Sequence, residues 1–167
     1  MKEVFGVTPK TFINTELLYS NEIGADVAEM GFNLMVTEGA KHVLGWKSPN
    51  YMYANNINPK LRLLLRNYRL SDDISLRFAS DCLTTDNYVE RLNEIKDGEV
   101  VNVCVDYDNF GYRYDDSTGI LNFMRYLPEA IFNNTDFEFA KPIEMLDKLQ
   151  TMSMFDAPIP LSCMDEE

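Results

Sequence analysis

The chain contains few of the residues from which redox, zinc and nucleophilic sites are built. Its 167 residues include one histidine, His42, and three cysteines, Cys82, Cys104 and Cys163. The cysteines lie far apart without the C-x-x-C spacing of a zinc or redox motif, so we expect reduced, buried thiols. His42 lies in a helix-like stretch with no partner for a catalytic triad, and we expect it to be a surface or packed residue.

Long apolar runs and positive charge are also scarce. The N-terminus, MKEVFGVTPK, lacks the apolar core of a signal peptide, and no later stretch approaches the roughly 18 apolar residues of a membrane helix. We therefore expect a cytoplasmic protein with no membrane partner. The 27 acidic and 15 basic residues give a net charge of −12, which repels phosphate backbones and argues against a nucleic-acid partner. A neutral ligand such as a sugar polymer is compatible with this charge, although the charge does not select one.

What the sequence does contain is typical of a compact domain. Hydrophobic residues make up 46% and charged residues 25% of the chain, close to the globular average. We predict one domain over residues 1–167. The chain is too short for a complete barrel, which needs about 250 residues.

Short apolar runs alternate with segments of helical spacing along the chain. The first three predicted strands, 11–14, 32–37 and 61–66, precede helices at 21–30, at 39–44 and from Ser71 onward. After a helix at 85–95, the run EVVNVCVDY predicts a buried strand over 100–105, followed by a helix at 118–127, a strand-like DFEFA segment and a helix over 142–150. The segment 45–59 is rich in turn residues and predicts a long aromatic loop. This alternation predicts an α/β fold with a parallel sheet.

Acidic residues follow the predicted strands. They are Glu16, Glu38, Asp72 or Asp73, and Asp106. Ligands of parallel α/β folds bind at the carboxyl ends of the strands, so these acids are expected along one rim. Two of them could act as nucleophile and acid/base on a sugar at a separation of about 5–5.5 Å. Divalent-metal binding and simple solvation remain alternatives.

Asp72 and Asp73 also have a local interpretation. They follow Ser71, and a serine N-cap followed by two acids suits the positive end of a helix. We favour this capping role over a supporting role in the site.

Four strings of residues decide between these alternatives. NTELLYS at 14–20, VTEGAKHVLGWKSPNYMY at 36–53, LLLRNYRLSDDISLRF at 63–78 and VDYDNFGYRY at 105–114 resemble consecutive stretches of the α-amylase-type branch of glycoside hydrolase family 57. They occur in the same order and at similar spacing. Around the fourth string, Asp108-Asn109 and Tyr112-Arg113 stand where the family has Glu-Thr and Glu-His.

The resemblance implies a retaining enzyme that acts on α-glucans without a metal or other cofactor. Glu16 takes the place of the family's nucleophile and Asp106 that of its acid/base. The fold it implies is a partial (β/α) barrel with parallel strands, about half of a seven-stranded, incomplete TIM-like barrel. We assign a set of substrate-binding candidates, the aromatic ones suited to stacking on glucose rings. They are Trp46, Tyr51, Tyr53, Glu38 and Asp73.

The resemblance leaves two other functions to be tested. One is a glycan-binding remnant without catalysis, and the other is a metal-dependent hydrolase such as a polysaccharide deacetylase on a related barrel. Family members extend both upstream and downstream of this chain, so we also expect open sheet edges and either self-association or a partner that supplies the missing barrel half.

Overall fold

The computed structural model describes residues 2–164. The chain divides into two compact units. The sheet unit comprises Met1–Asn67, Gly98–Asn102 and Ala140–Glu167, and the helical unit comprises Tyr68–Asp97 and Val103–Phe139. Each unit has its own core. None of the described helices is both long and apolar enough to cross a membrane. The prediction of one domain over residues 1–167 stays a prediction.

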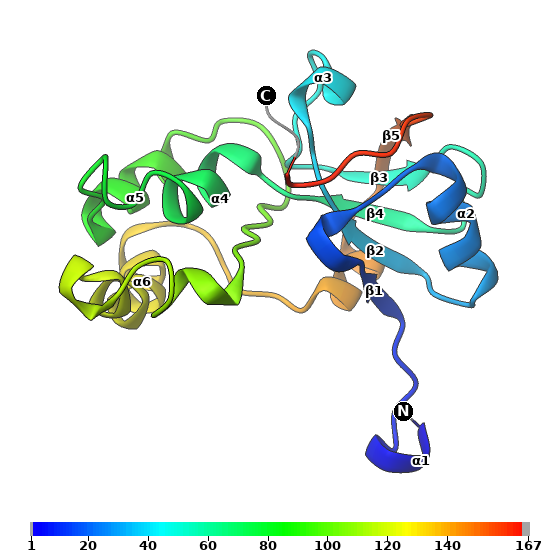
Figure 1. Cartoon of the computed structure of the whole chain (residues 1–167). Coiled ribbons are helices and arrows are strands. Elements are labelled where there is room, and N and C mark those ends of the chain that lie inside the picture. Colours follow the sequence, from blue (N-terminus) through cyan, green and yellow to red (C-terminus); the bar gives the residue numbers. More distant parts are fainter. Residues whose placement is uncertain (1, 165–167) are drawn as a thin grey trace. The chain divides into compact units, whose positions relative to one another are not determined.

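Five strands form the sheet of the sheet unit (Figure 1). They are β1 (Thr11–Ile13), β2 (Leu34–Thr37), β3 (Met52–Asn55), β4 (Arg62–Leu65) and β5 (Thr151–Phe155), in the order β1-β2-β4-β3-β5. The pairs β1–β2, β2–β4 and β3–β5 are parallel, and only β3–β4 is antiparallel. The fold class is therefore α/β with a mostly parallel sheet, as predicted, in which β3 and β5 run opposite to β1, β2 and β4.

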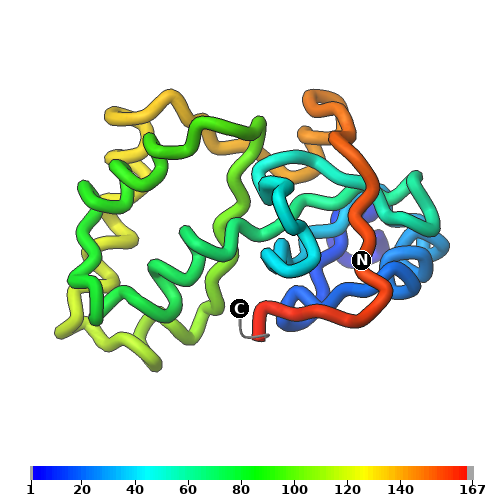
Figure 2. Tube along the Cα trace, turned by 90° about the horizontal axis from the view of Figure 1, so that it is seen from above, coloured from blue at the N-terminus to red at the C-terminus, as the bar shows by residue number. Residues whose placement is uncertain are grey.

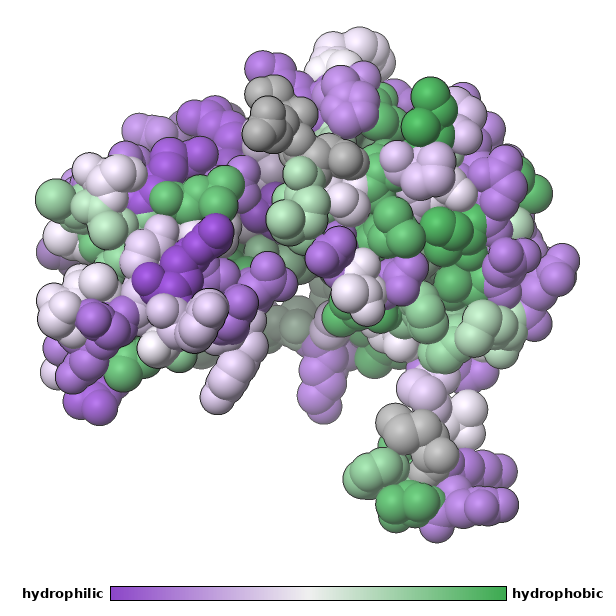
Figure 3. Space-filling view, viewed as in Figure 1, coloured by the Kyte–Doolittle hydropathy of each residue, from purple (hydrophilic) through white to green (hydrophobic). Residues whose placement is uncertain are grey.

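The central strands are buried on both faces. Every residue of β2 and β3 is buried, as are the last three of β4, which is the pattern of strands covered on both sides. The core cluster also takes Val27 from helix α2 (Asn21–Glu29) and Phe155 from β5. Figure 2 follows the chain from its blue N-terminal strands to the orange-red segment of β5, which returns beside β3. Some apolar side chains stay exposed on the visible face of this unit (Figure 3).

Short helices complete the sheet unit. They are α1 (Lys2–Phe5), the 3₁₀ helix η1 (Thr15–Leu17), α3 (Lys41–Leu44), the 3₁₀ helix η4 (Pro142–Glu144) and α7 (Met145–Lys148). None of the residues of α1 is buried, and Figure 1 shows this helix clear of the sheet. The segment after β5 returns along the segment after β1, where Tyr19 and Leu161 exchange two backbone hydrogen bonds of 2.8 and 2.9 Å.

The helical unit packs three helices around aromatic side chains. They are α4 (Tyr68–Ser75), α5 (Thr85–Asn93) and α6 (Ile120–Asn134), with the 3₁₀ helices η2 (Tyr107–Asn109) and η3 (Asp116–Thr118) between α5 and α6. Phe123 of α6 meets Phe78 and Tyr88 with ring centroids 5.3 and 5.7 Å apart. Both contacts are edge-on, the geometry that aromatic pairs prefer.

Several predicted elements are confirmed. The strands over 11–14, 32–37 and 61–66 and the helices over 21–30, 39–44 and 85–95 match β1, β2, β4, α2, α3 and α5 within a few residues. The helix over 118–127 continues to Asn134 as α6, and the helix over 142–150 is η4 with α7.

The predicted strand over 100–105 is wrong. Only Asn102 of this segment forms a bridge, to Arg66, and Val103 is 40% exposed. The reason is the sheet order, because β2 and β3 already occupy both edges of β4. The backbone of the segment instead bonds outside the strands, where Asn67 N–H donates to the Asn102 carbonyl at 2.8 Å and Val100 N–H donates to the Asn50 carbonyl at 3.1 Å.

The other local errors have similarly specific reasons. Ser71 is no N-cap, because α4 already begins at Tyr68 and the buried Ser71 hydroxyl accepts a 3.1 Å hydrogen bond from Cys104 N–H. The loop predicted over 45–59 contains β3, and 136–140 forms no strand. The prediction of buried thiols is wrong as well, since Cys82 is exposed and the other two cysteines are half-buried, although none forms a disulfide.

Candidate active site

Glu16 lies in a strained turn at the carboxyl end of β1. It adopts φ 54° and ψ 23° within η1, and Leu17 has φ 54° as well. Two consecutive residues other than glycine in the left-handed region are uncommon, and each costs roughly 1–3 kcal/mol. Glu16 is exposed whereas Leu17 is buried. The turn therefore directs the carboxylate toward solvent while anchoring the next side chain in the core.

Hydrogen bonds from both sides hold this turn. The Glu16 carbonyl accepts from Cys163 N–H at 2.9 Å. The Leu17 carbonyl accepts from the Thr37 hydroxyl at 3.0 Å and from Glu38 N–H at 3.3 Å. Strain of this kind persists only where the surroundings over-determine the backbone. Here the segment after β5 and the end of β2 hold the backbone of the turn in place through these hydrogen bonds.

Glu38 lies beside this turn, at the end of β2, but its side chain points into the protein. It is 3% exposed, and its Oε2 accepts from Arg66 Nη1 at 3.2 Å. Its Oε1 accepts from Gly39 N–H at 2.8 Å. A Cβ atom on Gly39 would lie 2.5 Å from the Arg66 carbonyl oxygen, so only glycine permits this approach. Glu38 therefore joins the ends of β2 and β4, a structural role at the predicted rim.

The three aromatic candidates differ in their exposure. Trp46 is 87% exposed and follows Gly45, which has φ 62°. Tyr51 is half-buried and packs against the core cluster. Tyr53 is 0% exposed, and its hydroxyl donates to the Ser48 carbonyl. Because stacking on a sugar requires an accessible ring face, Trp46 suits the predicted role, whereas Tyr53 is a core residue in this structure.

Asp106 belongs to the helical unit, where it precedes η2. Its side chain is exposed, and its carbonyl accepts from Asn109 N–H at 3.1 Å and from Asn109 Nδ2 at 3.0 Å. Asn109 is 2% exposed, and its Oδ1 is the one buried side-chain N or O atom without a hydrogen-bond partner found in the described part of the chain. Asn109 thus fixes the backbone directly after Asp106.

The far end of this loop is attached to α4. Arg113 Nη1 and the Tyr114 hydroxyl both donate to the Ser75 carbonyl, at 3.1 and 3.2 Å. The Tyr114 ring also packs on Phe78 with centroids 5.6 Å apart. Asp106 therefore sits on a loop fixed at both ends by polar side chains.

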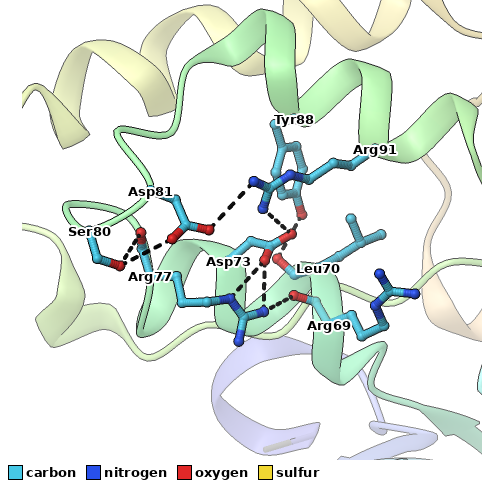
Figure 4. Close-up of polar contacts among 8 residues, drawn as sticks. All are labelled: Arg69, Leu70, Asp73, Arg77, Ser80, Asp81, Tyr88 and Arg91. Atoms are coloured by element: carbon cyan, nitrogen blue, oxygen red, sulfur yellow. Dashed lines mark hydrogen bonds and ion pairs between the residues drawn. The ribbon is translucent and has the colours of Figure 1, made fainter.

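Asp73 is held in an ion-pair network between α4 and α5 (Figure 4). Its Oδ1 accepts from Arg77 at 2.7 and 3.1 Å, and its Oδ2 accepts from Arg91 at 2.8 Å. The hydrogen bond that Arg91 donates to Asp73 raises the pKa of Arg91. Capping does not describe this residue, because its carboxylate joins two helices. Asp73 is a substrate-binding candidate, but both of its carboxylate oxygens already accept hydrogen bonds from arginines.

Two buried tyrosines have strongly shifted pKa values. Burial raises the pKa of Tyr19, in the sheet unit, to about 12. Burial also raises the pKa of Tyr88, whose hydroxyl donates to the Leu70 carbonyl at 3.2 Å. Neither phenol is exposed, so we assign both to structure.

The structure thus brings Glu16 and Glu38 together on one rim, at the ends of β1 and β2. Asp73 and Asp106 lie in the helical unit, and the meeting of Glu16 with Asp106 stays a prediction. Sequence reasoning missed Arg66, Asn109 and Arg113. The signal for Arg66 was a charged residue at the end of an apolar strand, which rarely stays buried unless it is paired.

Within residues 2–164, no three or more histidine, cysteine, aspartate or glutamate side chains come together as a metal-binding group. The single histidine, His42, is exposed on α3, in agreement with a surface role.

The chain is similar in sequence to known proteins. Residues 1–159 match the sequence profile described as "Glycosyl hydrolase family 57". The chain is 42% identical over 154 residues to a protein of Methanocaldococcus jannaschii named "Putative alpha-amylase", a match that covers 89% of this chain and 32% of that protein.

A solved structure shares the fold. It is the crystal structure of a 4-alpha-glucanotransferase from Thermococcus litoralis, which superposes with a TM-score of 0.65 at 20% identity. The superposition covers 92% of this chain and 25% of that one. The chain thus spans a third or less of the length of both relatives. Because the family profile extends over nearly its whole length, the chain belongs to glycosyl hydrolase family 57.

Proposed function

We propose that this chain carries part of the active site of a retaining α-glucan hydrolase or transglycosylase, with Glu16 as nucleophile and Asp106 as acid/base. Family membership supports the class of chemistry, and the relatives' names support an α-glucan substrate. In this proposal the chain forms part of a barrel, and Glu16 and Asp106 act by double displacement.

The reaction would proceed in two steps. The Glu16 carboxylate attacks the anomeric carbon and forms a glycosyl ester while Asp106 protonates the leaving oxygen. Asp106 then removes a proton from water, or from an acceptor sugar hydroxyl, which displaces Glu16. Trp46 would offer its exposed indole face to a glucose ring. Glu38 would keep the Glu16 turn in place through its backbone N–H and its ion pair with Arg66.

The observation that carries the proposal is the strained turn of Glu16. An exposed carboxylate sits on left-handed backbone at the end of a parallel strand, with hydrogen bonds to the carbonyls of Glu16 and Leu17. Local strain of this kind concentrates at functional sites. Ligands of such sheets bind at this end of the strands.

The second candidate function is that of a glycan-binding segment without catalysis, because the chain covers only part of its relatives. The match covers only 32% of the Methanocaldococcus jannaschii relative. Catalysis would require that strands corresponding to the rest of that relative complete the barrel. A metal-dependent deacetylase is the remaining alternative and predicts activity that a chelator abolishes.

Product formation separates these candidates. The purified chain is incubated with maltooligosaccharides beside Glu16→Gln and the control Glu29→Gln, which removes an exposed carboxylate at the end of α2. We expect Glu16→Gln to lose at least about a thousandfold in rate, because it lacks the nucleophile, while the control retains the wild-type rate. Equal rates in all three proteins would refute the catalytic role. Sugar binding that depends on Trp46 without any product would support the glycan-binding segment.

A further inference from the structure

A groove separate from the proposed catalytic residues opens between α5 and α6 in the helical unit. Its volume is about 460 Å³, within the range of roughly 300–1,000 Å³ typical of small-ligand sites. The start of α5 contributes Thr84, Thr85 and Asp86, and α6 contributes Tyr126, Glu129 and Asn133. The α6 residues recur at helical spacing and therefore share one face.

The lining combines one aromatic side chain with several polar ones. Tyr126 is 56% exposed and provides the only ring in the groove. Asp86, Glu129 and Asn133 are exposed, and no hydrogen bond or ion pair to their side chains is found within residues 2–164. An aromatic face beside carboxylate and amide groups suits a sugar ring, whose apolar face stacks while its hydroxyls donate and accept hydrogen bonds.

Electrostatics narrows the choice of ligand. The two carboxylates repel an anion such as a phosphate, although the N-terminus of α5 would otherwise attract one. The same helix end opposes a small cation, which would also find only two carboxylates in the groove. A neutral, hydroxyl-rich ligand meets neither obstacle.

We propose that this groove binds a linear α-glucan, with Tyr126 as the stacking platform and Asp86, Glu129 and Asn133 as hydrogen-bonding partners. The choice of α-glucan over other neutral sugars rests on the proposed function. Neither Glu16 nor Asp106 lines the groove, so it would hold the polymer through other residues and raise its local concentration.

Nuclear magnetic resonance of the full chain tests this proposal without requiring turnover. The ¹⁵N-labelled chain is titrated with maltoheptaose, and the same titration is run on Tyr126→Ala and on Phe132→Ala. Phe132 is 68% exposed on the same helix but does not line the groove. We expect saturable amide shifts at 84–86 and 126–133 in the wild type and in Phe132→Ala. In Tyr126→Ala we expect affinity at these amides to fall about fivefold or more, because a stacking contact is lost.

Other results would overturn the proposal. Maltoheptaose shifts confined to residues outside the groove would do so while leaving the proposed function intact. Turnover of maltoheptaose without any amide shift at 84–86 and 126–133 would also overturn the groove proposal and leave the proposed function intact. A groove response to trilysine that exceeds the response to maltoheptaose at equal concentration would instead identify a basic peptide as ligand. If the groove amides shift but Glu16→Gln leaves the rate of product formation unchanged, sugar binding in the groove is supported and the catalytic assignment of Glu16 is refuted.

Discussion

In the sheet unit the backbone positions Glu16, whereas in the helical unit side chains position the loop of Asp106. The Glu16 turn is fixed mainly by main-chain hydrogen bonds from the segment after β5 and from the end of β2. The Asp106 loop depends on Asn109, Arg113 and Tyr114. A turn held by backbone tolerates exchange of surface side chains. A loop held by three side chains does not, and two of the three stand where the chain departs from the family's Glu-Thr and Glu-His pairs.

The largest effect is expected from the ion pair beneath the Glu16 turn. Arg66→Met removes the guanidinium that pairs with Glu38, and the side chains of Arg66 and Glu38 are 7% and 4% exposed. Breaking a buried pair by removing one partner costs about 3–5 kcal/mol of unfolding free energy. Chemical denaturation monitored by circular dichroism measures this loss.

The double variant Glu38→Gln/Arg66→Met is the control for that prediction. It removes both charges, so we expect it to be more stable than Arg66→Met alone. Equal stability of the single and double variants would show that the rim does not depend on this pair.

Alkaline pH probes the two units separately through their buried tyrosines. The pKa of Tyr19 is raised to about 12, so between pH ~10 and ~12 the unfolded chain loses a proton that the folded chain keeps. The contribution of Tyr19 to the free energy of unfolding is fully present below pH ~10 and is lost as the pH rises, by about 2–3 kcal/mol in all. Tyr19→Phe should remove that decrease from the pH dependence of unfolding.

Tyr88→Phe is the matching variant in the helical unit, since burial raises the pKa of Tyr88 as well. We expect each variant to remove part of the alkaline loss of stability. A pH profile identical to wild type in either variant would contradict the burial of that phenol.

A smaller loss is expected from Asp73→Asn in the helical unit. Asp73 pairs with two arginines whose side chains are 42% and 34% exposed, and solvent screens such pairs. We expect a loss of about 1–2 kcal/mol in denaturation experiments, smaller than that of Arg66→Met. Asp81→Asn, whose pairing distance to Arg91 is 3.5 Å, should change stability by less than about 0.5 kcal/mol.

The smallest effect on stability is expected from Arg113→Met. It removes one of two hydrogen bonds to the Ser75 carbonyl, worth about 1 kcal/mol or less. A misplaced acid/base nevertheless lowers kcat by up to about 100-fold for a 1 Å error, so the loss of activity should exceed the loss of stability. Arg113→Lys, which can still donate to Ser75, should restore part of kcat with little change in KM. No recovery with lysine would contradict the positioning role.

The sequence predicted the elements whose signal is local. The apolar strands β1, β2 and β4 and helices such as α2, with its Ser20 cap, follow directly from periodicity and capping. The sequence analysis predicts neither β3 nor β5: MYAN lies in a segment rich in turn residues, and TMSMF is assigned to no element. The single strand partner of β5 in this sheet is β3, about a hundred residues earlier in the chain, and no local pattern reports such a pairing.

The predicted site had a similar limit. Spacing after the strands located Glu16 and Glu38 at the ends of β1 and β2, but not that the first is exposed and the second is buried against Arg66. The predicted strand over 100–105 failed because β4 had no free edge, so Asp106 comes from a loop. Sequence shows which residues are acidic, whereas only packing decides which of them face solvent.

The central claim is that Glu16 and Asp106 act on one sugar. The most direct measurement is the separation of their carboxyl carbons in a crystal structure of the full chain bound to a maltooligosaccharide. The account predicts about 5–5.5 Å with a glucose ring between the two groups, as in retaining enzymes. A separation greater than about 10 Å, beyond even the range of inverting enzymes, would contradict it.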